Sequence, residues 1–196
     1  MNVRDQLLDA AARVYAEAGY RGATTRRIAQ AAGVNEITLF RHFGSKETLL
    51  HEAIARAAAE PAAVELPQVP RNPVREVSDW ARAQLAHMTD RRSIIRTCLG
   101  EMEEHPAILS SIDKAPVRAT AALASYLRRL RDRKIARARF DEQVAAAMLM
   151  GSLFGDAMGR DTMPEMFSRS TEDSLREYVQ LLLRGIGVAF GEEQRA

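Results

Sequence analysis

The spacing of apolar residues limits the possible folds of this chain more than any other feature. Apolar side chains recur three or four positions apart and never strictly at every second position, and runs of β-branched residues are absent. The first period matches one face of an α-helix, whereas a half-buried strand needs alternation. The chain is therefore predicted to be all-α, with about nine helices.

Length and composition describe an ordinary globular protein. The chain has 196 residues, of which 46% are hydrophobic and 28% charged, enough for one large or two small domains. No apolar stretch approaches the ~20 residues that a membrane helix needs, and Met1–Asp9 carries both acids and bases, unlike a secretory signal. We therefore expect no membrane association and a cytoplasmic location.

Cysteine, histidine and net charge exclude several kinds of site. The single cysteine, Cys98, excludes an intramolecular disulfide, a four-cysteine zinc site and a CxxC redox pair, and the four histidines show no metal-ligand spacing. We therefore expect no metal and no cofactor. A net charge of +2 means that nucleic-acid binding would need a local basic patch.

Capping residues and glycines divide the first sixty residues into four helices. The first ends at Gly19, the second begins after Thr24 or Thr25 and ends at Gly33, and the next two have Asn35 and Ser45 as N-caps. The third helix is predicted to turn Leu39, Phe40 and Phe43 inward.

A proline-rich segment ends this group of helices. Residues 61–73 hold four of the seven prolines, which forbid a continuous helix. We therefore expect a head at residues 1–60, a linker at 61–73 and a body at 74–196. In the body, apolar spacing predicts helices over Val74–Met88, Ser93–Glu104, Pro116–Leu130, Asp141–Met158 and Thr171–Phe190.

The second and third helices form a recognisable pair. Two short helices separated by a tight turn at Gly33 fit a helix-turn-helix, whose second helix enters a major groove of DNA. The stretch GATTRRIAQAAGVNEITLFRHFGSKETLL, residues 22–50, closely resembles the signature of the TetR/AcrR family of transcriptional regulators, with the strong match running from about Val3 to Ile54. The resemblance implies a homodimer whose subunits have a helix-turn-helix head and a helical-bundle body for ligand binding and dimerisation. It also implies a repressor that a small molecule releases from a palindromic operator.

The resemblance, together with residue chemistry, predicts the DNA contacts. A helix N-terminus can hold a phosphate, and arginine can bind phosphate or guanine. The acid of the recognition helix, Glu36, has two interpretations: it accepts from cytosine N4, or it stabilises the helix dipole. Phe40 stands where many relatives carry a tyrosine, so it cannot make that hydroxyl's phosphate contact. The predicted DNA-binding residues are Thr24, Thr25, Arg26, Arg27, Asn35, Glu36, Ile37, Thr38, Arg41, His42 and Lys46.

In the body, small residues recur every four positions along one predicted helix. Glycine inside a helix costs ~1 kcal/mol relative to alanine, so we expect either close approach of another helix or a frayed helix end near Gly159. The resemblance places the dimer interface on the last two helices, and the residues predicted for it are Ala147, Gly151, Gly155, Gly159, Leu175, Tyr178, Val179, Leu182, Leu183 and Ile186. The ligand-pocket candidates are Trp80, Gln84, Met88, Cys98, Met102, Tyr126, Met148 and Phe154, and the scarcity of acids among them favours a neutral or apolar effector.

Other readings of the chain remain open. The basic run from Arg128 to Arg139 either contacts an anionic partner or is a solvated helix end. A helical-bundle enzyme is disfavoured because no Glu-x-x-His pair appears. A small-molecule-binding protein with a degenerate head is the other alternative. The sequence favours a DNA-binding regulator without enzymatic activity, whose partners are a pseudo-palindromic DNA operator, a second copy of itself and a small-molecule effector.

Overall fold

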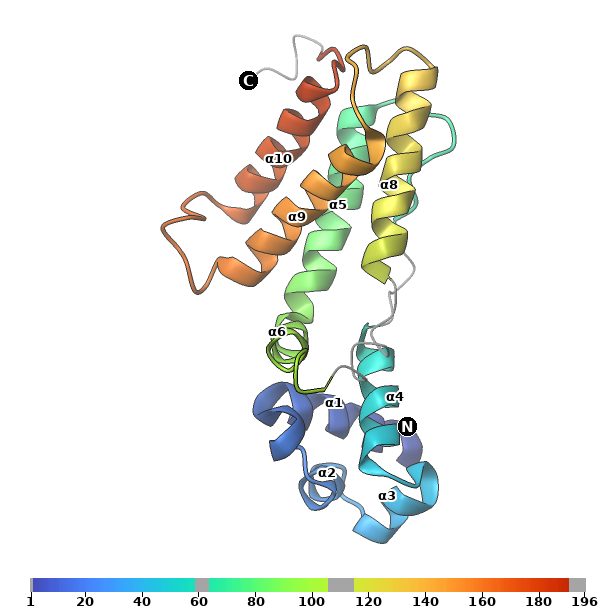
Figure 1. Cartoon of the computed structure of the whole chain (residues 1–196), viewed down its shortest axis with the longest axis vertical. Coiled ribbons are helices and arrows are strands. Elements are labelled where there is room, and N and C mark those ends of the chain that lie inside the picture. The colour runs from blue at the N-terminus through green and yellow to red at the C-terminus, as the bar shows by residue number, and fades with distance from the viewer. Residues whose placement is uncertain (1, 59–63, 106–114, 191–196) are drawn as a thin grey trace. The chain divides into compact units, whose positions relative to one another are not determined.

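The computed structural model describes residues 2–58, 64–105 and 115–190. These residues form nine helices and no strand beyond one isolated bridge, so the all-α prediction is confirmed (Figure 1). None of these helices is long and apolar enough to cross a membrane. Their bounds are α1 Val3–Gly22, α2 Thr25–Ala31, α3 Glu36–Phe43, α4 Lys46–Ala58, α5 Pro73–Asp90, α6 Arg92–Gly100, α8 Ala115–Asp132, α9 Glu142–Gly159 and α10 Thr171–Gly185.

The chain forms two compact units. The head comprises Met1–Glu60 with Arg91–Ala115, and the body comprises Pro61–Asp90 with Pro116–Ala196. The sequence division put everything after residue 73 in the body, but α6 belongs to the head. The reason is that α6 buries Cys98 and packs Ile94 against the apolar core of α1 and α4.

Both units are built on amphipathic helices. In the head, Leu7, Tyr15, Ile28, Leu39 and Leu49 are fully buried in one cluster. In the body, α5, α8, α9 and α10 enclose a second cluster, whose largest members are Trp80, Tyr126, Leu123, Leu127 and Leu130. Each helix thus buries one apolar stripe, as the 3–4 spacing predicts.

The end predicted at Gly19 is confirmed, because Gly19 has a left-handed φ of 67° and breaks α1 there; a short second segment carries the bounds of α1 on to Gly22. Two other helix ends differ from the prediction. The sixth ends at Gly100 and not at Glu104, and turns follow it. The last ends at Gly185 and not at Phe190, because Gly187 has a φ of 77° and Val188 pairs with Ala136 in the isolated bridge.

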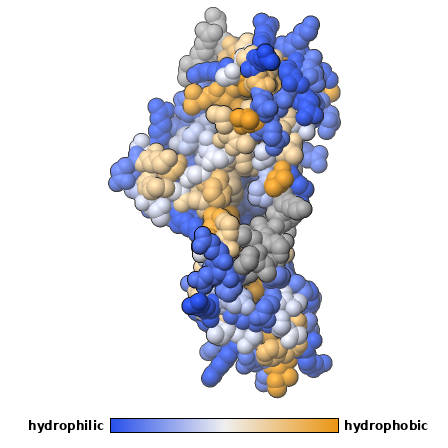
Figure 2. All heavy atoms as spheres, in the orientation of Figure 1, coloured by the Kyte–Doolittle hydropathy of each residue, from blue (hydrophilic) through white to orange (hydrophobic). Residues whose placement is uncertain are grey.

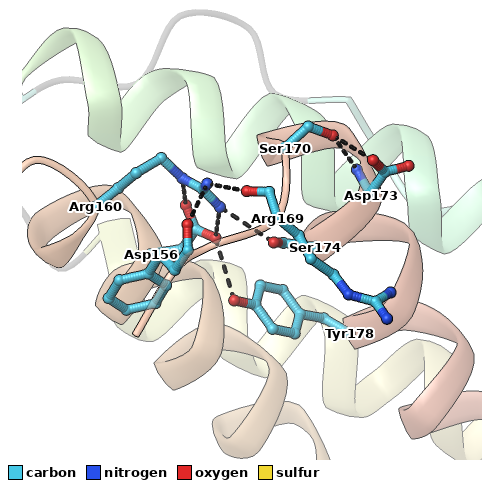
Figure 3. Close-up of polar contacts among 8 residues, drawn as sticks. Asp156, Arg160, Arg169, Ser170, Asp173, Ser174 and Tyr178 are labelled. Atoms are coloured by element: carbon cyan, nitrogen blue, oxygen red, sulfur yellow. Dashed lines mark hydrogen bonds and ion pairs between the residues drawn. The ribbon is translucent and has the colours of Figure 1, made fainter. Parts of the chain in front are cut away.

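A buried ion pair closes the connection between α9 and α10 (Figure 3). Asp156 is 1% exposed, and its carboxylate accepts two hydrogen bonds from Arg160, at 2.8 and 2.5 Å, and one from the Tyr178 hydroxyl at 3.1 Å. The Arg160 guanidinium also donates to the backbone carbonyls of Phe167 and Arg169 and to the Ser174 hydroxyl. This one side chain therefore fixes the segment between the two helices.

We expect Asp156→Ala to lower the free energy of unfolding by about 2 kcal/mol, because it leaves the Arg160 charge without its carboxylate partner. The loss is smaller than the ~3–5 kcal/mol for breaking a fully buried pair, because the Arg160 side chain is 22% exposed and keeps its other hydrogen bonds. Denaturant unfolding of the full chain measures the change. Asp79→Ala is the matched control, since it removes a solvent-exposed pair with Arg82, for which we expect less than about 1 kcal/mol. Equal losses in the two variants would contradict the assigned role of the Asp156 pair.

Candidate nucleic-acid interface

The helix-turn-helix is formed by α2, the turn at Gly33 and α3. The Thr24 hydroxyl caps α2 by accepting from the Arg27 N–H at 3.2 Å, and Gly33 has the left-handed φ of 70° that the turn needs. The Asn35 side chain caps α3 by accepting from the Ile37 N–H at 2.9 Å. The caps predicted at Thr24 and Asn35 are thus confirmed.

The outer face of α3 carries apolar side chains in contact with solvent. Ile37 is 68% exposed and Phe40 46%, and Arg41 lies beside them at the i+4 position. Leu39 and Phe43 are buried as predicted, whereas the inward orientation predicted for Phe40 is wrong. Figure 2 shows orange, hydrophobic atoms at the end of the head that bears α3. Burying these side chains requires a partner surface, and thymine methyl groups in a major groove offer one.

Glu36 joins the two helices of the motif. Its Oε1 accepts a hydrogen bond from the Thr25 hydroxyl at 2.5 Å. This hydrogen bond spans the turn and occupies both the Thr25 hydroxyl donor and one carboxylate oxygen of Glu36. The geometry therefore favours a local, positioning role for Glu36 over cytosine recognition. The hydroxyl donor of Thr25 is occupied by the same bond, so a phosphate at this helix end would have to bind the Thr25 backbone N–H.

The predicted cationic contacts lie in different surroundings. Arg26, Arg41 and His42 are exposed, and neither arginine has an ion pair among the described residues. Arg27 pairs with Glu17 at 3.0 Å, but both side chains are about half exposed, so the pair adds little stability and can be exchanged for a phosphate. The unpaired arginines are free to contact DNA without first losing a partner.

Lys46, at the first residue of α4, is held against the head. Its Nζ donates to the Tyr20 carbonyl at 2.5 Å and lies 4.0 Å from the centre of the Tyr20 ring. Partial burial lowers the pKa of Lys46. An ammonium group has three N–H donors, so this bond leaves two for a phosphate.

Tyr20 was missed by the sequence reasoning. Its hydroxyl donates to Glu47 Oε1 at 2.7 Å, and the carboxylate raises the pKa of Tyr20 to about 12. A tyrosine directly after a helix-breaking glycine was the one signal available, and it does not identify a partner.

In the body, four of the predicted interface residues face the interior of their own unit. Leu175, Val179, Leu183 and Ile186 are at most 3% exposed, so they offer almost no surface to a second copy, and of the four only Ile186 lines the groove between α9 and α10. Tyr178 and Leu182 keep part of their surface and line an apolar groove between α9 and α10. The groove also includes three more exposed side chains that the interface prediction omitted, Val144, Met148 and Leu181.

The small-residue strip of α9 meets two different surroundings. A Cβ added to Gly151 would meet nothing within 4 Å, whereas one added to Gly159 would lie 2.5 Å from the Phe167 ring. Ala147 and Gly151 are exposed and Gly155 is half-buried. Within the subunit, the residue that packs closely on Gly159 and offsets the cost of a glycine in the helix is therefore Phe167, from the loop after α9, and not a residue of a neighbouring helix.

The eight ligand-pocket candidates do not come together in the described residues. Trp80, Gln84 and Tyr126 are buried in the body core, and Met88 is partly buried beside them. The others are dispersed: Cys98 lies in the head core, Met102 is exposed after α6, and Met148 and Phe154 are exposed on α9. Of the eight, only Met148 lines the groove.

The basic run at the end of α8 belongs to the body. Arg131 pairs with Glu142, and the Arg129 guanidinium lies 5.5 Å from the centre of the Tyr126 ring. These contacts agree with the interpretation of the run as a helix end.

Comparison with known proteins agrees with the geometry. The family described as bacterial regulatory proteins, tetR family, matches residues 7–53. Over 92% of this chain and 95% of its own length, the uncharacterized HTH-type transcriptional regulator YvkB of Bacillus subtilis (strain 168) is 24% identical. The HTH-type transcriptional repressor AcnR of Corynebacterium glutamicum is 43% identical over 32% of this chain and 34% of its own.

The fold of the whole chain also has a counterpart. The solved structure of the flavonoid-responsive regulator FrrA aligns with a TM-score of 0.67 and 22% identity, over 94% of each chain. The related proteins are regulators and not enzymes, as the sequence predicted. Together with the capped α2–turn–α3 motif, the family match shows that residues 7–53 form the DNA-binding head of the TetR family of bacterial regulatory proteins.

Proposed function

We propose that this protein is a repressor that binds a pseudo-palindromic operator as a homodimer and leaves it when a small molecule binds the body. The observation that carries the proposal is the solvent-exposed face of α3, where Ile37 and Phe40 stand beside the unpaired Arg41. Repression is proposed because the similar protein AcnR is a transcriptional repressor, and ligand response because FrrA, which shares the fold, is a flavonoid-responsive regulator. The proposal also places the protein in the cytoplasm, with its DNA.

Within the head, the residues divide into readers and anchors. We assign Ile37, Thr38 and Phe40 to apolar contacts with bases or sugars, and Arg26 and Arg41 to guanine or phosphate. The remaining predicted contacts, Thr24, Thr25, Arg27, Asn35, His42 and Lys46, are assigned to phosphates. Glu36 is assigned to holding α2 and α3 together, because it is bonded to Thr25.

The exposed apolar surface of α9 and α10 supports the dimer. Helix α9 buries Leu149 and Leu153 on one side, and it exposes Val144 and Met148 on the other. A helix with apolar side chains on opposite sides is expected to be covered on both sides in the working protein. Two copies related by a two-fold axis would cover each other's grooves and set their recognition helices ~34–36 Å apart, on successive major grooves.

The effector is proposed to be neutral or apolar. The body core around Trp80, Met88 and Tyr126 is packed from aromatic and aliphatic side chains, and Gln84 is a buried amide among them that would orient a ligand by hydrogen bonding. A shift in melting temperature on adding single compounds from a panel of neutral aromatics would identify such a ligand.

The proposal is tested by selecting bound fragments from the source organism's own DNA with the purified protein, at low and near-physiological salt. Recovery of one or a few palindromic sites at both salt concentrations supports it. Binding that is weak and independent of sequence contradicts it and would favour a degenerate head.

The salt dependence of operator affinity measures how many DNA phosphates the protein neutralises. If each head neutralises roughly four phosphates, a dimer should show a slope of log K against log salt near −7, from ~0.9 per phosphate. We expect a slope steeper than about −4. Titrations of one operator fragment between 50 and 300 mM salt, roughly a sixfold range, measure it. A flatter line would mean that these basic residues do not hold the DNA backbone.

A further inference from the structure

Tyr20 is fixed in the head through each of its polar groups. Its N–H donates to Glu101 Oε1 at 2.6 Å, its carbonyl accepts from Lys46 Nζ at 2.5 Å, and its hydroxyl donates to Glu47 Oε1 at 2.7 Å. Lys46 and Glu47 are the first two residues of α4, and Glu101 follows the last residue of α6. Tyr20 therefore links the turn after α6 to the N-terminus of α4.

The break in α1 makes this link possible. Gly19 has φ 67° and ψ −174°, so the N–H that follows it is not aligned with the helix's own carbonyls. Glu101 supplies the missing acceptor. A Cβ on residue 19 would lie 2.4 Å from Glu101 Oε1, and a side chain at that φ is strained in any case. Glycine at this position thus admits the carboxylate.

Neighbouring contacts hold α6 and the turn after it against α1. The Thr97 hydroxyl donates to the Ala16 carbonyl at 3.1 Å, and the His105 ring lies 4.0 Å from the Tyr20 ring, centre to centre. The second carboxylate oxygen of Glu101, Oε2, is buried and has no hydrogen-bond partner among the described residues. A buried oxygen without a partner is unfavourable, and the hydrogen bond from the Tyr20 N–H to Oε1 offsets part of that cost.

We propose that Glu101 is a positioning residue for operator binding, which fixes Tyr20 so that the Tyr20 carbonyl and ring hold the Lys46 ammonium where it meets a DNA phosphate. Lys46 has two donors left after its bond to Tyr20, and it stands at the N-terminus of α4, where the helix dipole also favours an anion. The proposal rests on the DNA-binding function above and adds to it a residue outside the helix-turn-helix.

The test compares full-length Glu101→Ala with Glu103→Ala. Each variant removes one carboxylate, and the two positions are two residues apart. Glu103 is exposed and forms no hydrogen bond or ion pair among the described residues. We expect Glu101→Ala to weaken operator binding about tenfold relative to the control. We also expect it to flatten the salt slope by about one per head, since one phosphate contact is lost in each. Glu101→Gln, whose amide oxygen can still accept from the Tyr20 N–H, should restore the slope of the wild type.

Two further variants show whether the effect passes through Lys46. Lys46→Ala alone should lose the same part of the slope, and Glu101→Ala should change it no further in the Lys46→Ala background. Gly19→Ala adds a Cβ that displaces the Glu101 carboxylate, so it should flatten the salt slope as much as Glu101→Ala does. It replaces Glu101→Ala in the test if circular dichroism shows that Glu101→Ala is unfolded.

The outcomes separate this inference from the function on which it rests. A folded Glu101→Ala or Gly19→Ala protein with an unchanged salt slope overturns the inference, even if its melting temperature falls. An equal loss in the presence and absence of Lys46 also overturns it. If wild-type protein selects no operator at all, the proposed function itself has failed.

Discussion

Replacing Arg26 and Lys46 together by alanine is expected to weaken operator binding by about 1000-fold and to leave the dimer folded. The two residues lie on different helices of the head, and in a dimer the double substitution removes four cationic contacts. Arg26 is exposed and has no ion pair in the described chain, so its loss leaves nothing unpaired within the protein. Lys46 adds a charge held in place by Tyr20. Titration of the selected operator at fixed salt measures the loss.

The control for this variant is Arg128→Ala with Arg133→Ala. It removes the same charge from two exposed positions of the basic run in the body. We expect less than about a threefold change, because charges that do not touch the DNA act on it only through a screened field. If the control loses as much affinity as the head variant, the basic run is a DNA contact and the assignment to Arg26 and Lys46 is wrong. An unchanged affinity of the head variant refutes the assignment directly.

The predictions that held depend on local chemistry. The caps at Thr24 and Asn35 and the turn at Gly33 need only residues within three positions of each other, so the sequence shows them directly. The exposure of the Phe40 side chain to solvent was harder to predict. In an eight-residue helix the apolar residues Leu39, Phe40 and Phe43 are all within reach of one stripe, and packing against α1 and α4 selects two of them.

The contacts that were missed are distant in sequence. Tyr20 and Glu101 are 81 positions apart, and no periodicity relates a turn after α6 to a break in α1. The placement of α6 in the head was missed for the same reason, since its apolar stripe fits a head core or a body core equally well. Helix α9 could not be oriented from its sequence for a different reason. Most of its positions are apolar or glycine, so the pattern does not show which side faces the core of the subunit.

The outer side of α9 leads to the second prediction, that Leu181→Glu converts the dimer into a monomer. Leu181 is 64% exposed and lines the groove between α9 and α10, where two-fold symmetry would bury it in each copy. The substitution then places two carboxylates in one apolar interface without partners. We expect the dissociation constant of the dimer to rise more than 100-fold, by at least about 3 kcal/mol, since a buried unpaired charge costs this much or more. Sedimentation velocity at micromolar concentration measures the change.

Val117→Glu is the matched control, because Val117 lies in the same unit, on α8, and is 67% exposed outside the groove. Val117→Glu also replaces an exposed aliphatic side chain by a carboxylate, at a similar exposure, so this variant should remain a dimer. A monomeric Leu181→Glu protein should also lose its preference for a palindrome over a single half-site, since each head then binds alone and the gain from the second head is lost. If Leu181→Glu remains dimeric, the two copies associate through another face. The exposed apolar surface of α9 would then need a different occupant, and a palindromic operator would have to be explained by that other interface.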